Sequence, residues 1–169
     1  MRLNIATFVG VVASTLYAAS PAAALSAGDV IGTWKLISNV RQAVGSDKVV
    51  NNLGENPSGV LIITSESRFI VLFTAANRKP AKTPEEQAQL QKTHIAYTGL
   101  VSFEPDSTDA SRLKMTNKVD IAWNAEWAGT TQIRFLSLQG NRLTIKTPVI
   151  KNPFTGEQAV ATLVFERSK

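Results

Sequence analysis

The 169-residue chain contains no cysteine and a single histidine, His94. Disulfide bonds and thiolate metal sites are therefore excluded, and a lone imidazole gives no basis for a zinc site. The sequence also lacks a phosphate-binding glycine loop, a dinucleotide fingerprint and a G-x-S-x-G turn, three common carriers of catalytic or cofactor chemistry. We therefore expect neither a metal nor a cofactor, and no motif indicates a reaction class.

The sequence also has no run of basic residues. Its net charge of +5 comes from 18 basic and 13 acidic residues. The basic residues are spread singly along the chain, as Lys35, Arg41, Arg68 and Lys118 illustrate. Nucleic-acid-binding proteins instead gather lysine and arginine on one face. We interpret these basic residues as part of a solvated exterior and expect no nucleic-acid partner.

The N-terminal residues predict a secretory signal peptide. Arg2 is followed by an apolar stretch over residues 5–19 and then by Ser20, Pro21 and three alanines. The stretch is shorter than the roughly 20 apolar residues of a membrane-spanning helix, so an uncleaved anchor is the less favoured alternative. We expect a secreted or periplasmic protein with no stable membrane insertion after cleavage.

Small residues place the expected cleavage after Ala24, with Ala27 as a second possible site. The signal peptide would then cover residues 1–24 and the mature domain residues 25–169. A domain of this size buries enough surface to fold without a disulfide. The sequence leaves the oligomeric state open.

The remaining pattern is that of a mainly β protein. Eight β-rich runs are separated by clusters of turn residues, at 31–40, 60–64, 68–74, 95–103, 113–121, 130–138, 143–148 and 158–167. Short strands spaced in this way predict an up-and-down antiparallel barrel of about eight strands with one short helix. The runs 60–64 and 68–74 are apolar on both faces, so we expect a lid or helix to cover their outer side.

The helix is predicted from its capping residues. Thr83 can cap its N-terminus, Pro84 suits the first helical position, and Glu86 completes a capping box. If the helix continues past His94, then Leu90, His94 and Tyr97 share one face. This narrow apolar stripe predicts a short helix that lies over the barrel.

The first and last predicted strands carry a characteristic combination of residues. Gly32-Thr33-Trp34 opens the first strand and Arg167 lies near the end of the last. Because the first and last strands of a closed barrel are neighbours, Arg167 can lie across the indole of Trp34 and seal that end. This arrangement resembles the signature of the lipocalins and the wider calycin superfamily.

Longer segments are similar to the bacterial and fungal lipocalin-like domain family. They are GTWKLIS, LGENPSGVLIIT, IAYTG, WNAEWAGTTQIRF and LTIKTP, which together span nearly the whole predicted domain. The resemblance implies a lipocalin-like barrel with an internal small-molecule cavity. It implies little about the identity of the ligand.

Arg134 is the first candidate for a ligand-binding residue. Gln132 and Arg134 share one face of a strand, and Ile133 and Phe135 share the other. If the polar pair faces inward, Arg134 can bind a carboxylate or polarise a carbonyl inside an apolar cup. If it faces outward, Phe135 packs in the core and Arg134 is a surface residue. Alternation alone does not decide between the two.

Four further residues are candidates near the mouth of the barrel. His94 and Tyr97 can form a polar gate, or they can be a solvated histidine and a tyrosine packed at the rim. Trp123 and Trp127 flank a short connection, where they can stack on a planar ligand or plug the barrel base.

We therefore favour a non-enzymatic, exported protein that holds a small apolar or amphiphilic ligand in its barrel. One alternative is a barrel-type isomerase or cyclase, in which Arg134, Tyr97 or His94 shifts a proton. Another is a ligand-free envelope interaction module with a filled barrel.

Overall fold

The computed structural model describes residues 24–51 and 53–168. The predicted signal peptide, apart from Ala24, lies outside the described residues. Within the described part of the chain, no helix has both the length and the apolar character needed to cross a membrane.

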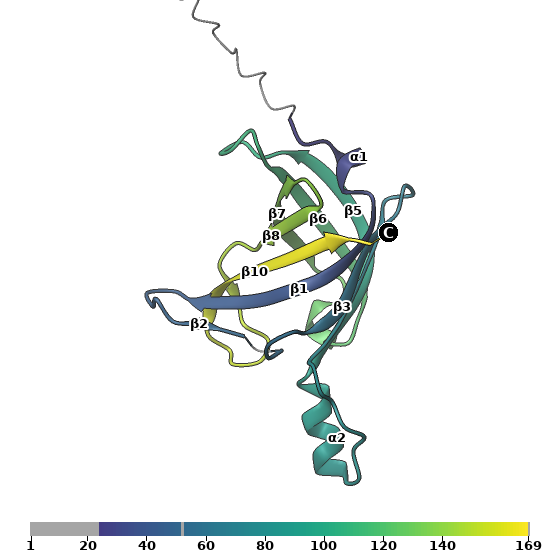
Figure 1. The fold of residues 1–169 in the computed structure, drawn as a ribbon, viewed down its shortest axis with the longest axis vertical. Coiled ribbons are helices and arrows are strands. Elements are labelled where there is room, and N and C mark those ends of the chain that lie inside the picture. The colour runs from purple at the N-terminus through teal and green to yellow at the C-terminus, as the bar shows by residue number, and fades with distance from the viewer. Residues whose placement is uncertain (1–23, 52, 169) are drawn as a thin grey trace, which may run out of the picture.

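Eight antiparallel strands close into a barrel (Figure 1). They are β1 (Gly32–Ala43), β3 (Ser58–Ile63), β4 (Arg68–Thr74), β5 (His94–Pro105), β6 (Leu113–Ala122), β7 (Thr131–Gln139), β8 (Arg142–Lys146) and β10 (Gln158–Arg167). Two short strands, β2 (Val49–Val50) and β9 (Ile150–Lys151), extend the ends of the sheet. Pairing of β1 with β10, from Trp34 and Arg167 to Ala43 and Ala159, closes the barrel. The predicted mainly β barrel is confirmed.

Side chains that alternate inward along each strand occupy most of the barrel interior. Large side chains that are almost fully buried include Trp34, Leu36, Leu61, Phe69, Leu136, Leu143 and Phe165. Burial of each such side chain stabilises the fold by roughly 1.5–3 kcal/mol. This core spans several strands of the barrel, so it fixes their register.

The hairpin between β3 and β4 turns at residues 65–67, but no described lid or helix covers its outer face. Ser67 adopts a positive φ of 62° and donates its backbone N–H to the carbonyl of Thr64. On the outer face of β4, Ile70 and Leu72 remain 39% and 48% exposed. The predicted lid or helix over this hairpin is therefore wrong.

Helix α2 (Pro84–Gln91) begins as its sequence predicts. The hydroxyl of Thr83 accepts a hydrogen bond from the backbone N–H of Glu86 at 3.2 Å. The carboxylate of Glu86 reaches one residue further back and accepts from the N–H of Lys82. The start is therefore fixed by local hydrogen bonds rather than by packing.

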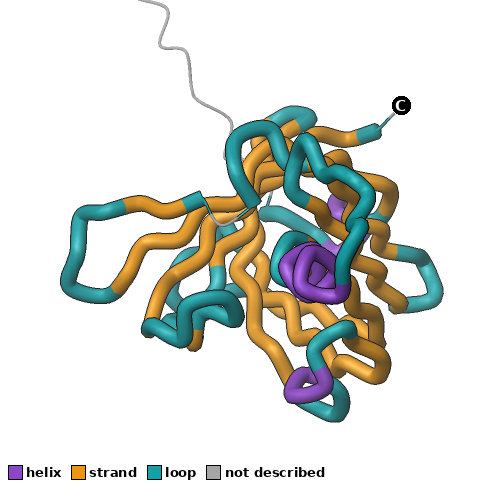
Figure 2. The backbone as a smooth tube through the Cα atoms, turned by 90° about the horizontal axis from the view of Figure 1, so that it is seen from below, coloured by secondary structure: helices purple, strands orange, loops and turns teal. Residues whose placement is uncertain are grey.

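The end of α2 differs from the prediction. The helix stops at Gln91, and His94 opens β5 by pairing with Thr74 of β4. A shared helix face for Leu90, His94 and Tyr97 is therefore wrong, because strand pairing takes His94 and Tyr97. The helix buries none of its residues and projects from one end of the barrel (Figures 1 and 2). It does not lie over the barrel.

Two shorter helical segments complete the described structure. They are α1 (Ala27–Val30), before the first strand, and a single 3-10 turn, η1 (Ala125–Trp127), between β6 and β7. The second lies where a turn or short helical connection was expected.

A bulge in β1 changes which residues face the interior. Trp34 and Leu36 are buried in the first half of the strand, whereas Asn39 and Arg41 are buried in the second half. The pairing with β10 shifts between Leu36 and Ser38. An extra residue in one strand reverses the inward and outward faces that follow it. The bulge thereby turns Arg41 into the barrel.

The N-terminal end of β1 lies at the end of the barrel that Trp34 and Arg167 seal. The guanidinium carbon of Arg167 lies 4.1 Å from the ring centroid of Trp34, whose indole N–H donates to the carbonyl of Val30 at 2.9 Å. Arg167 also donates to the carbonyl of Ile31. Gly32 has a φ of +132°, and a Cβ there would lie 2.9 Å from Arg167. The positive φ favours glycine at this position, and a larger residue would also displace the end of the Arg167 side chain.

Candidate ligand-binding cavity

A cavity of about 40 Å³ lies inside the barrel. Its apolar wall is formed by Leu61, Val71, Phe73, Ile95, Met115, Ile145, Ile150, Ala161, Leu163 and Phe165. A single water molecule needs roughly 10–15 Å³ of such space, so the cavity can hold a few waters or a small chemical group. The barrel is therefore not completely filled by its own side chains.

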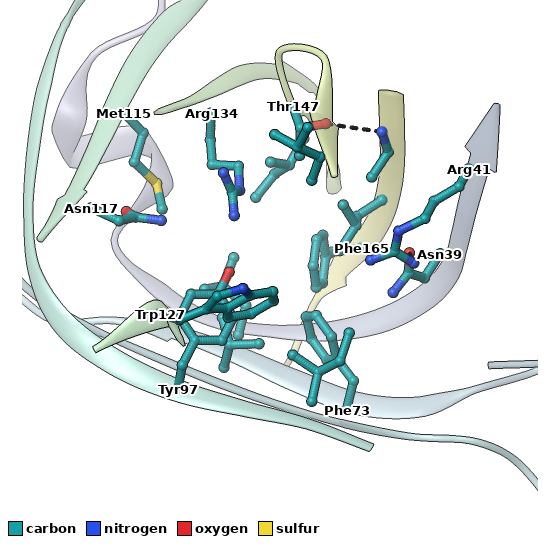
Figure 3. A pocket seen from close by; sticks show the side chains of 17 residues that line it. Asn39, Arg41, Phe73, Tyr97, Met115, Asn117, Trp127, Arg134, Thr147 and Phe165 are labelled. Carbon is teal, nitrogen blue, oxygen red and sulfur yellow. Dashed lines mark hydrogen bonds between the residues drawn. The ribbon is translucent and has the colours of Figure 1, made fainter. Parts of the chain in front are cut away.

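Arg134 reaches into this cavity from β7 (Figure 3). Its side chain is almost entirely buried, with 8% of the residue exposed. One terminal nitrogen donates to the carbonyl of Ile133 at 2.7 Å, and the other donates to Oε1 of Gln132 at 2.6 Å. Gln132 therefore holds the guanidinium in place, while Ile133 and Phe135 belong to the opposite face of the strand.

A second arginine, Arg41, lines the same cavity from β1 (Figure 3). Only 5% of this residue is exposed. Its Nη1 donates to Oδ1 of Asn39 at 3.2 Å, and its guanidinium carbon lies 5.5 Å from the ring centroid of Phe154. Burial lowers the pKa of Arg41 to about 10, and the positive charge of Arg134 acts in the same direction. The interior therefore disfavours this charge.

Several buried polar atoms around the cavity have no hydrogen-bond partner among the described residues. They are Nε of Arg41, Nδ2 of Asn39, and both Nδ2 and Oδ1 of Asn117. Asn117 comes from β6, where it pairs with Gln132 of β7. Buried polar atoms in native proteins are nearly always hydrogen-bonded to protein, water or ligand. These atoms are therefore suited to contact a bound polar group.

Aromatic side chains cover one side of the cavity. Tyr97 and Trp127 both line it, with ring centroids 5.2 Å apart in an edge-to-face arrangement. Trp123 packs against Trp127 at 6.2 Å and against His94 at 5.3 Å. Phe154 stacks on Trp123. We call these five residues the aromatic cap.

The structure separates the predicted site residues into three groups. Arg134, Tyr97 and Trp127 line the cavity, and Gln132 supports Arg134. His94 and Trp123 belong to the outer layer of the aromatic cap and do not line the cavity. The signature residues Gly32, Trp34 and Arg167 lie at the closed end instead.

Sequence reasoning missed four polar residues that line the cavity. They are Asn39, Arg41, Asn117 and Thr147, the last of which accepts the backbone N–H of Ala161 at 2.9 Å. The interpretation of Arg41 as a solvated exterior residue is wrong, because the β1 bulge turns it inward. Asn117 carried a usable signal, since it shares a strand face with the apolar residues Met115 and Val119.

The residues present define no metal site. Among the described residues, no group of three or more histidine, aspartate or glutamate side chains could hold an ion. The part of the lining that the structure describes contains none of these three residue types.

A closed eight-stranded barrel with a mainly apolar internal cavity defines a lipocalin-like protein, an architecture consistent with small-ligand binding. The chain belongs to the family described as Lipocalin-like domain, whose family model matches residues 31–168. The resemblance seen in the sequence is thereby confirmed. No curated protein matches the chain.

Proposed function

We propose that this protein is an exported carrier that holds a small apolar or amphiphilic molecule in its barrel. The observation that carries the proposal is the internal cavity, which combines an apolar wall with buried polar atoms that have no hydrogen-bond partner among the described residues. Binding pockets for small molecules commonly have this composition, with a few polar groups that fix orientation.

The lining favours a carrier over an isomerase or cyclase. Its titratable side chains within the described chain are Arg41, Tyr97 and Arg134. Arginine and tyrosine side chains ordinarily hold their protons near neutral pH, so they are poor general bases there. His94, the residue type best suited to proton transfer, packs outside the cavity against Trp123.

Native mass spectrometry of protein purified from its own host tests the carrier proposal. We expect a reproducible stoichiometric adduct that is released on denaturation and that has an apolar portion. A second readout is tryptophan fluorescence, because Trp127 lines the cavity and should respond when a ligand enters. A clean protein mass in repeated preparations, with no fluorescence response to added amphiphiles, would contradict ligand binding.

Export is the second part of the proposal and is supported by the N-terminal sequence. Ser26 donates its N–H and its hydroxyl to the carboxylate of Asp29, at 2.8 and 2.6 Å, at the start of α1. The small residues before Leu25 favour cleavage after Ala24, and the mature chain then keeps this contact. N-terminal sequencing of protein from the medium or periplasm should begin at Leu25. An intact Met1 on protein confined to the cytoplasm would refute export.

A further inference from the structure

The cavity contains two positively charged side chains and no described negative one. Arg41 and Arg134 are both buried, and neither takes part in any of the ion pairs of the described residues. The described lining includes no aspartate or glutamate. A buried charge is strongly disfavoured unless an opposite charge or several hydrogen bonds compensate it. The interior of the barrel is therefore electrostatically complementary to an anion.

The hydrogen bonds within the protein leave donors free around the two arginines. In the part of the chain that the structure describes, Nε of Arg41 and Nδ2 of Asn39 on β1, and Nδ2 of Asn117 on β6, have no hydrogen-bond partner. Figure 3 shows Asn39 and Arg41 on one side of the cavity, with Asn117 and Arg134 on the other. The free donors therefore face the cavity from two opposite walls.

We propose that the ligand of this barrel carries a carboxylate, which binds between Arg41 and Arg134. The inference rests on the proposed function and specifies the chemical class of the ligand. A carboxylate has two acceptor oxygens that match the planar fork of a guanidinium. The cavity of about 40 Å³ has room for a group of this size.

The positions of the supporting residues agree with this assignment. Gln132 and the carbonyl of Ile133 accept hydrogen bonds from Arg134, and Asn39 accepts one from Arg41. These acceptors are all neutral, so they orient the two guanidinium groups without neutralising them. A ligand carboxylate supplies the missing negative charge, which a neutral ligand or water does not.

A matched pair of probes tests the proposal with the intact protein. Acetate and ethanol share a methyl group, are small enough for the cavity and differ in the charge of the end group, and calorimetric titration at pH 7 measures both. We expect acetate to bind at least tenfold more tightly than ethanol. Arg41→Met and Arg134→Met should each weaken acetate binding by about 10- to 100-fold, the usual effect of losing a charged hydrogen bond. Binding of ethanol should change less than threefold.

Arg68→Met is the matched control, because Arg68 lies on the exterior and is paired with Asp120 at 2.8 Å. It should leave the affinity for both probes unchanged. Equal affinities for acetate and ethanol, unaffected by either cavity variant, would overturn the carboxylate assignment and leave small-ligand binding intact. Failure of both probes to bind, together with the absence of a co-purifying adduct, would overturn the proposed function itself. Circular dichroism of each variant establishes that it is folded.

Discussion

Replacing Arg41 by methionine should make the protein more stable, although most substitutions in a protein interior have the opposite effect. Methionine has a similar length and a flexible apolar chain, so it can fill the same space. The substitution removes a charge that the barrel buries without a carboxylate partner among the described residues. Buried ionic groups can often be replaced by apolar residues with a gain in stability.

The expected gain can be worked out from the contacts of Arg41. Burial lowers its pKa to about 10, and each pKa unit corresponds to about 1.4 kcal/mol, so the charge costs on the order of 3 kcal/mol. Its hydrogen bond to Asn39 and its contact with Phe154 are lost as well, at a combined cost of about 1–2 kcal/mol. A net stabilisation of about 1–2 kcal/mol remains.

Urea denaturation and thermal unfolding of the ligand-free protein at pH 7 measure this difference. A gain of this size should raise Tm by about 3–6 °C in a domain of this length. The control is Arg68→Met, which removes an exposed pair with Asp120 and should cost about 0–1 kcal/mol. An Arg41→Met protein with unchanged or lower stability would refute the argument that the buried charge is uncompensated. Saturating carboxylate should reverse the order, since it binds the wild type more tightly.

Substitutions at three further positions have defined outcomes. Gly99→Ala should cost about 2–3 kcal/mol in urea denaturation, because its Cβ would lie 2.0 Å from the carbonyl oxygen of Lys118; unchanged stability would contradict this close approach. Arg167→Ala should cost about 1–2 kcal/mol through the loss of its contact with Trp34, whereas Arg167→Lys should retain part of it. Hydrogen bonds from Thr108, with a contribution from Arg112, lower the pKa of Asp106. Its stabilising contribution is therefore present above the usual aspartate pKa of about 4 and is lost as pH falls further; Asp106→Asn should reduce this acid sensitivity in a pH series of urea unfolding curves.

Most of the fold can be predicted from the sequence because its strands are short, β-rich and separated by turn residues. The eight predicted runs correspond to the eight barrel strands. The start of α2 is also local information, since Thr83 and Glu86 make their capping contact within one turn. The end of α2 cannot be predicted from neighbouring residues, because His94 pairs with Thr74 on another strand instead of continuing the helix. Long-range pairing therefore decided where the helix stopped.

The site is less predictable for a geometric reason. Strand alternation reveals which residues share a face, and it correctly grouped Gln132 with Arg134. It does not reveal which face points inward, and it fails beyond a bulge. The register shift after Leu36 reverses the faces of β1, so Asn39 and Arg41 enter the cavity against the pattern set by Trp34. Because of this one extra residue, the sequence pattern did not identify Arg41, one of the two charged residues that line the cavity.

The pairing of β1 with β10 also has a consequence for how the chain folds. Residues 34–43 of β1 pair with residues 159–167 of β10. The two strands that close the barrel are therefore the barrel strands farthest apart in the sequence. Contacts of long sequence separation form slowly, because a long loop must be ordered before they are gained. The barrel therefore cannot close during synthesis until β10 has emerged.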